Sequence, residues 1–254
     1  MREFIVNLVS TYESNLEISL FSIWHILFFV IIMAVAFSLA FYLKNKTDDL
    51  KIKVLNIVAI VAISLYVLDF FIMPLYRDTM DTDKLPFHFC TLTSILACFV
   101  QFNKKFNFMR EPVTMLAVVT PLMYLVYPGS AIGDIPPFCY KVLQTFIFHG
   151  AVFTWGFLSI TTKQTELDIK RGWKSLVLIV VIIIWAFFGN ITYSTSEHSY
   201  DWCFIMGGLF AFIPNEIMFL AVIVAVFAMV NIIYGIYYAT IKIMKNIEAK
   251  KTNN

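Results

Sequence analysis

Seven continuous apolar stretches, each 17–28 residues long, dominate this sequence of 254 residues. A helix needs roughly 20 apolar residues to cross about 30 Å of hydrocarbon, whereas a strand of a membrane barrel needs only about 9–11. Runs of this length therefore predict membrane-spanning helices rather than strands. The predicted spans are residues 20–43, 54–75, 86–102, 112–128, 138–160, 175–191 and 213–240.

The composition agrees with a membrane protein and excludes several other classes. Hydrophobic residues make up 60% of the chain and charged residues 14%, against about 45–50% and about 25% in soluble domains. A soluble globule, a disordered chain, a coiled coil and a secreted disulfide scaffold are all excluded. The net charge of +2 indicates no nucleic-acid partner, so membrane lipids are the expected partners. With no repeat and no linker, we expect residues 1–254 to form one integral membrane domain, an all-α, polytopic seven-helix bundle.

The basic residues predict the orientation of this bundle. Of the 19 Lys and Arg residues, 15 fall on alternate connecting segments and 4 on the other side, where Lys141 lies at the start of span 138–160. The side richer in Lys and Arg faces the cytoplasm, which puts the N-terminus outside and the C-terminus in the cytoplasm. The expected location is the cell membrane. Residues 1–18 carry no signal-peptide pattern and are predicted to form a surface segment.

A small set of polar residues interrupts the spans. Ionisable side chains cost free energy in hydrocarbon and therefore usually face the bundle interior and mark function. On the predicted orientation these residues gather in the outer half of the membrane: His25, Asp69, His88, Cys90, Gln144, His149, Asn190 and Glu216. Residues near span ends, such as Asn190 and Glu216, also fit a simpler interpretation in which they meet interfacial water.

The third and fifth predicted spans carry the most informative spacing. His88 and Cys90 point roughly 200° apart on a regular helix, so they can cooperate only if the chain after Pro86 is irregular. On the fifth span, Thr145 and His149 share a face, and Gly150 allows another group to approach closely.

Three short motifs resemble one known family. Residues 85–93, L-P-F-H-F-C-T-L-T, resemble the L-P-x-H-x-C signature of the YwaF-like bacterial membrane proteins. The pair His149–Gly150 within Q-x-x-x-x-H-G and the element G-N-I-T-Y at 189–193 are similar too, and the resemblance covers residues 20–240. That family is grouped with the eukaryotic transmembrane protein 164 family, whose members act as acyltransferases on phospholipids. Residues 192–212 depart from it, because they keep only fragments of its tyrosine-, proline- and tryptophan-rich pattern.

The resemblance implies a lipid acyltransferase or hydrolase in which Cys90 accepts the acyl group and His149 or His88 is the general base. Cys–His chemistry also needs a group that orients the imidazole, for which Asp69 or Glu216 is available. Gln144 or Asn190 could stabilise an oxyanion, and His25 completes the predicted substrate-binding set with Glu216. The depths disagree, however, since Cys90 lies about 6 Å and His149 about 16 Å from the ends of their predicted spans. Cys90 could instead be a packing residue.

Two other functions remain open on the sequence alone, namely a carrier or binding protein for a small polar solute and a non-catalytic scaffold. No cofactor is expected. His25, His88, His149 and Asp69 could in principle bind a metal, but nothing in their spacing requires one. Cys139 and Cys203 both fall on the predicted outer side and could form a disulfide.

Overall fold

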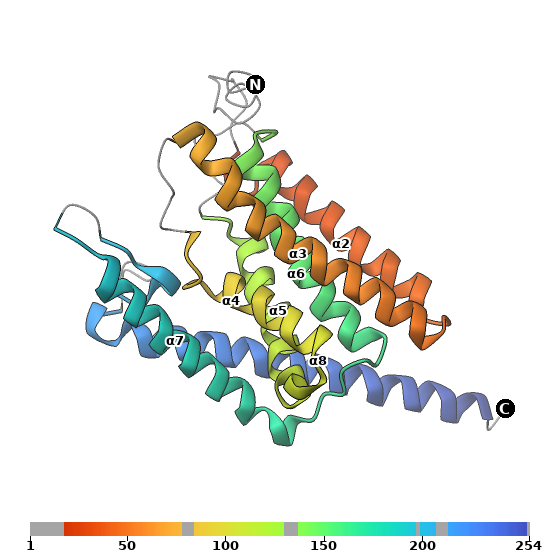
Figure 1. The fold of residues 1–254 in the computed structure, drawn as a ribbon. Helices are drawn as coiled ribbons and strands as arrows, with labels where there is room; N and C mark the ends of the chain where they lie inside the picture. The colour runs from red at the N-terminus through yellow and green to blue at the C-terminus, as the bar shows by residue number, and fades with distance from the viewer. Residues whose placement is uncertain (1–17, 78–83, 130–136, 197–198, 207–212, 253–254) are drawn as a thin grey trace.

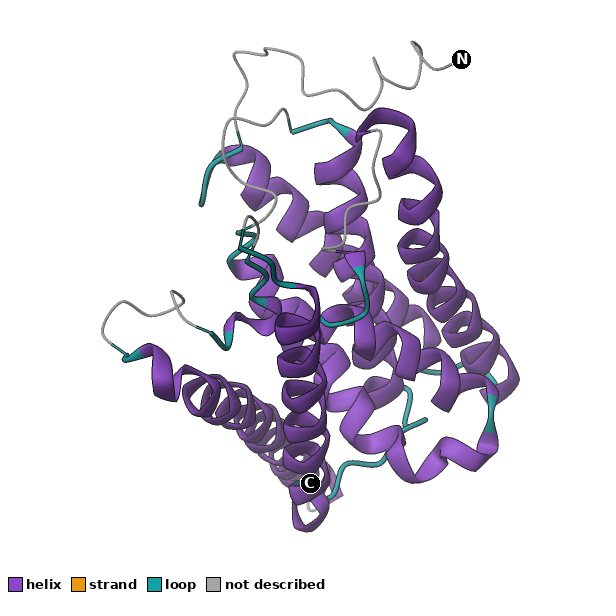
Figure 2. Cartoon of the chain, turned by 60° about the vertical axis from the view of Figure 1, so that its left-hand side comes forward, coloured by secondary structure: helices purple, strands orange, loops and turns teal. Residues whose placement is uncertain are grey.

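The computed structural model describes residues 18–77, 84–129, 137–196, 199–206 and 213–252. These residues form helices and loops, with no strand among them (Figure 2). The main helices are α2 (Ile23–Leu43), α3 (Asp48–Arg77), α4 (Phe89–Phe102), α5 (Arg110–Val126), α6 (Tyr140–Thr161), α7 (Trp173–Tyr193) and α8 (Met218–Thr252). Short 3-10 turns join them: η2 (Lys104–Met109), η3 (Ile169–Arg171), η4 (Trp202–Phe204) and η5 (Asn215–Ile217).

Each predicted span coincides with one of these helices, and six of them, all except α4, are long and apolar enough to cross a membrane. Two bounds differ clearly from prediction. α3 begins at Asp48 and α8 continues to Thr252, because Lys, Asp and Glu are acceptable in a helix once it has left the hydrocarbon. Of the predicted surface segment at 1–18, all but Ile18 lies outside the described residues.

Helix α4 is the exception in length. Its 14 residues extend about 21 Å, less than the roughly 30 Å of a hydrocarbon core. The first residues of the predicted span, Pro86 to His88, are not helical. The chain therefore reaches the start of α4 as irregular backbone.

The most buried helices are α5 and α6, which pack against each other at the centre of the bundle. Twelve of the 17 residues of α5 and 14 of the 22 of α6 are buried, whereas only three of the 21 residues of α2 are. In Figure 1, α4 and α5 lie between α3 with α6 on one side and α7 with α8 on the other. The apolar outer face of α2 is what lipid contact requires, since lipid tails are as apolar as the side chains.

Contacts between the helices give their directions. The side chain of Tyr140 bonds Asp69 and that of Gln144 bonds the Leu65 carbonyl, so α3 and α6 are antiparallel. Phe28 contacts Phe146 and Phe37 contacts Phe157, so α2 runs parallel to α6. An alternating bundle of this kind is the arrangement that short connections between consecutive spans produce.

Candidate active site

The site is built around the irregular segment 84–88 that leads into α4. Non-helical backbone is tolerated inside a membrane protein only where other groups satisfy its carbonyls. Three side chains from different elements do so here. Tyr66 on α3 donates to the Lys84 carbonyl at 2.9 Å, Trp185 on α7 donates to that of Pro86 at 2.8 Å, and the Cys203 thiol in η4 donates to that of Phe87 at 3.1 Å.

This irregular start fulfils the condition that the sequence set for His88 and Cys90. His88 is the N-cap of α4, with an extended backbone (φ −83°, ψ 149°), so the 200° separation of a regular helix does not apply. Both side chains are partly exposed. His88 lies within electrostatic range of Lys84 and of His149.

Cys90 lies in the first turn of α4 and faces the Thr120 hydroxyl on α5. The antiparallel packing of these two helices explains the pairing. Arg110 at the start of α5 donates to the Val100 carbonyl near the end of α4, and ten residues back along α4 and ten forward along α5 lead to Cys90 and Thr120. The hydroxyl of Thr120 also donates to the Leu116 carbonyl at 3.0 Å.

His149 lies on α6, where its ring contacts an aromatic side chain and a backbone carbonyl. Its ring stacks on Tyr124 of α5, with centroids 3.7 Å apart and 9° between the planes. Its Nδ1 lies 2.7 Å from the Thr145 carbonyl, one turn earlier on the same helix. A carbonyl oxygen accepts only, so Nδ1 carries the proton and Nε2 keeps the lone pair of the neutral ring.

Cys90 and His149 therefore meet α5 at two residues, Thr120 and Tyr124, that are four positions apart on one face. This spacing corresponds to about 6 Å along the helix axis. The predicted spans place Cys90 and His149 at different depths in the membrane. This difference in depth is smaller in the structure, because α6 extends further than α5 and because α4 begins after irregular backbone. The structure thus places Cys90 of α4 and His149 of α6 against neighbouring residues of α5 rather than in a hydrogen bond with each other.

Asp69, the predicted orienting carboxylate, has other partners. It is buried and pairs with Lys84 at 2.9 Å. It also accepts a hydrogen bond from Tyr140 at 2.7 Å. Gln144, a predicted oxyanion donor, donates to the Leu65 carbonyl at 3.3 Å. These contacts fasten α3 to α6 and to the segment that precedes His88.

The other three predicted residues lie in separate places. His25 is buried at the start of α2, where Nε2 contacts the Leu125 carbonyl at 2.8 Å and Nδ1 accepts from Phe21 N–H at 3.0 Å. Asn190 binds both backbone groups of Trp202, accepting from its N–H and donating to its carbonyl. Glu216 is exposed in η5. The disulfide considered for Cys139 and Cys203 is not formed, since both are free thiols.

Cys203 instead contacts the irregular segment before α4, through its bond to the Phe87 carbonyl. Burial raises the pKa of its thiol, an effect that the nearby backbone N–H of Phe89 reduces. It also lies within electrostatic range of Cys90. The Asn190–Trp202 pairing holds the turn that carries it, which gives the G-N-I-T-Y element a structural role.

Sequence reasoning missed Thr120, Tyr124, Lys84 and Glu111. The first two sit in an apolar stretch with no charge, and Lys84 lies in a loop. Glu111 falls just before the predicted span 112–128, but it is buried in the first turn of α5. Its carboxylate accepts from Arg171 at 2.8 Å, Tyr234 at 2.9 Å and the Asp168 N–H at 2.6 Å.

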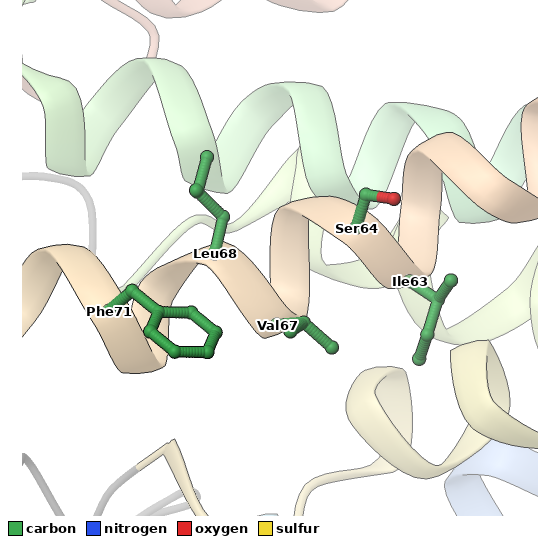
Figure 3. Close-up of a pocket in the computed structure, with 5 residues that line it drawn as sticks. All are labelled: Ile63, Ser64, Val67, Leu68 and Phe71. Atoms are coloured by element: carbon green, nitrogen blue, oxygen red, sulfur yellow. The ribbon is translucent and has the colours of Figure 1, made fainter.

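Two further features bear on the chemistry. Among the described residues, no three His, Cys, Asp or Glu side chains come together as metal ligands. A groove of about 280 Å³ runs along α3, lined by Ile63, Ser64, Val67, Leu68 and Phe71. Figure 3 shows Ile63, Val67 and Phe71 on one side of α3, facing away from α6. The groove is apolar apart from Ser64.

Comparison with known proteins identifies a family. A family model described as the TMEM164 family matches residues 20–234. No curated protein and no solved structure matches the chain.

Proposed function

Since this chain belongs to the TMEM164 family and is a multi-pass membrane protein, we propose that it is a lipid acyltransferase or hydrolase. Cys90 is the nucleophile and His149 the general base. The observation that supports this assignment is the meeting of both side chains with one face of α5, at Thr120 and Tyr124. Nucleophile and base must come within hydrogen-bond reach in the reacting complex, and such bonds often tighten only when substrate is bound.

The proposal also covers the subfamily of the protein, its membrane topology and its location. The L-P-x-H-x-C motif at 85–90 makes it a YwaF-like member of the family. The short helix α4 counts as the third of seven crossings. The N-terminus lies outside, the C-terminus in the cytoplasm, and the location is the cell membrane. The site then opens toward the outer leaflet.

The chemistry needs no reagent beyond the lipid substrates. Nε2 of His149 takes the thiol proton, and the Cys90 sulfur attacks the carbonyl carbon of a lipid ester. The ester C–O bond breaks, the alcohol leaves with the proton, and a thioester remains on Cys90. A hydroxyl of a second lipid, or water, then attacks the thioester and loses its proton to His149, and the sulfur leaves and is reprotonated.

The surroundings of Cys90 suit such a reaction. The backbone N–H groups in the first turn of α4 have no partner within the helix, and their positive end stabilises a developing negative charge. The Thr120 hydroxyl, whose proton is donated to the Leu116 carbonyl, lies beside the sulfur and can accept from the thiol. The acyl chain of the donor would lie in the apolar groove on α3, the helix that also carries Asp69.

The test is acyl transfer in lipid nanodiscs with a labelled phospholipid donor and a lysophospholipid acceptor. We expect Cys90→Ala to abolish transfer and His149→Ala to lower it by about 10²- to 10⁴-fold, the usual contribution of a general base. His88→Ala tests the other histidine. Cys98→Ser is the matched control, because Cys98 lies on the same helix and donates to the Ala59 carbonyl on α3.

Unchanged lipid profiles with the wild-type protein, across phospholipid donors with different headgroups, would disprove the proposed enzymatic activity. Solute uptake into proteoliposomes then tests the alternative of a carrier. Full activity in Cys90→Ala would also overturn the assignment, since no thioester could form.

A further inference from the structure

Tyr124 stacks on the His149 ring, and it has no part in the reaction as proposed. The planes of the two rings are almost parallel, at 9°, and their centroids are 3.7 Å apart. Phe148 meets the same imidazole edge-on, at 5.1 Å and 82°. The imidazole thus has one aromatic face pressed flat against it and one aromatic side chain at a right angle.

A single hydrogen bond does not fix the plane of an imidazole. The Nδ1 contact with Thr145 fixes which nitrogen carries the proton, but a hydrogen bond tolerates a range of ring angles about the Cβ–Cγ bond, whose preferred angles are broad. The flat contact with Tyr124 limits this rotation, because any turn of the imidazole would drive it into the phenol ring. Stack and hydrogen bond together define both the tautomer and the plane.

The packing of α5 against α6 makes the stack possible. A Cβ on Gly156 would lie 2.9 Å from the Ala117 backbone, so the two helices approach closely there. Seven residues back along α6 is His149, and seven residues forward along α5 is Tyr124. Seven residues are almost two full turns, so the pair lies on the same faces of the two helices as the close contact.

We infer that Tyr124 is a positioning residue, whose ring holds the His149 imidazole in the plane in which Nε2 serves Cys90. This inference rests on the proposed function. It assigns Tyr124 no bond to substrate and no proton to carry. The aromatic ring is the functional part, so phenylalanine should replace it.

Kinetics in nanodiscs test the role in catalysis. We expect Tyr124→Leu to lower kcat by about 10- to 100-fold, the size of effect that a displacement of about 1 Å produces, with KM changed less than about twofold. Tyr124→Phe should stay within about threefold of wild type. Tyr127→Leu is the control, since Tyr127 is an exposed aromatic residue at the end of the same helix.

Proton NMR of the imidazole tests the contact without any turnover. Ring current from Tyr124 shifts the His149 carbon-bound protons upfield, and His149→Gln assigns them by their loss. The shift should persist in Tyr124→Phe and disappear in Tyr124→Leu. A shift that survives in Tyr124→Leu would overturn the inference, as would a wild-type kcat in a Tyr124→Leu protein that has lost it. If the wild-type protein transfers no acyl group, the proposed function fails while the stack remains measurable.

Discussion

Phe87 lies so close to Gly189 that a Cβ added to the glycine would come within 2.5 Å of the Phe87 ring. The same ring stacks on Trp185 at 5.2 Å and contacts Trp202 at 4.8 Å. Two of the recognised motifs, L-P-F-H-F-C and G-N-I-T-Y, are thus in direct contact. The aromatic cluster fixes the segment that carries His88 and Cys90.

We expect Gly189→Ala to destabilise the protein by about 1–3 kcal/mol, the usual cost of overpacking. The Phe87 ring cannot move aside, because its neighbours enclose it. Thermal unfolding in detergent measures the effect. Gly235→Ala is the matched control, since a Cβ there meets nothing within 4 Å. Equal melting temperatures for the two variants would contradict the packing argument.

Asn190→Leu should release the turn that carries Cys203. The change removes both hydrogen bonds to the Trp202 backbone. Each backbone group left buried and unpaired lowers the free energy of unfolding by about 1–3 kcal/mol. Burial raises the pKa of the Cys203 thiol, so at neutral pH it is protonated and reacts slowly. We expect faster maleimide labelling of Cys203 in Asn190→Leu than in wild type. Asn231→Leu, which removes only a bond within α8, should not change that rate.

The Asp69–Lys84 pair is open to a double-mutant cycle. Asp69→Asn should destabilise the protein, because the amide keeps the oxygen that accepts from Tyr140 but turns an NH2 donor toward the Lys84 ammonium. Lys84→Met should cost at least as much, since it leaves the buried Asp69 carboxylate without its paired cation. We expect a coupling free energy of about 1–3 kcal/mol from unfolding of the single and double variants. Simple additivity of the two changes would show that the pair contributes nothing.

Glu111→Gln should weaken the joint between α5 and α8. The carboxylate accepts three hydrogen bonds, and an amide keeps only one oxygen to accept them. We expect a loss of about 1–3 kcal/mol in unfolding free energy, with Tyr234→Phe losing less because it removes one bond alone. Glu216→Gln, at an exposed position, should leave stability unchanged.

The sequence alone predicted the membrane helices and most of the residues now gathered near α4. Continuous apolar runs can be satisfied only by lipid and by backbone hydrogen bonds within a helix, so length and hydrophobicity were enough to locate α2, α3, α5, α6, α7 and α8. The scarcity of polar residues in those runs likewise drew attention to Asp69, His88, Cys90 and His149.

Only the tertiary structure decided which of these residues face each other. Spacing along one helix gives a face and a depth, but not the register between helices, which depends on contacts such as Gly156 with Ala117 and Arg110 with Val100. That register put Thr120 beside Cys90 and Tyr124 on His149. It also pairs Asp69 with Lys84 and Asn190 with Trp202, because a buried polar group bonds to the partner that packing brings within hydrogen-bond distance.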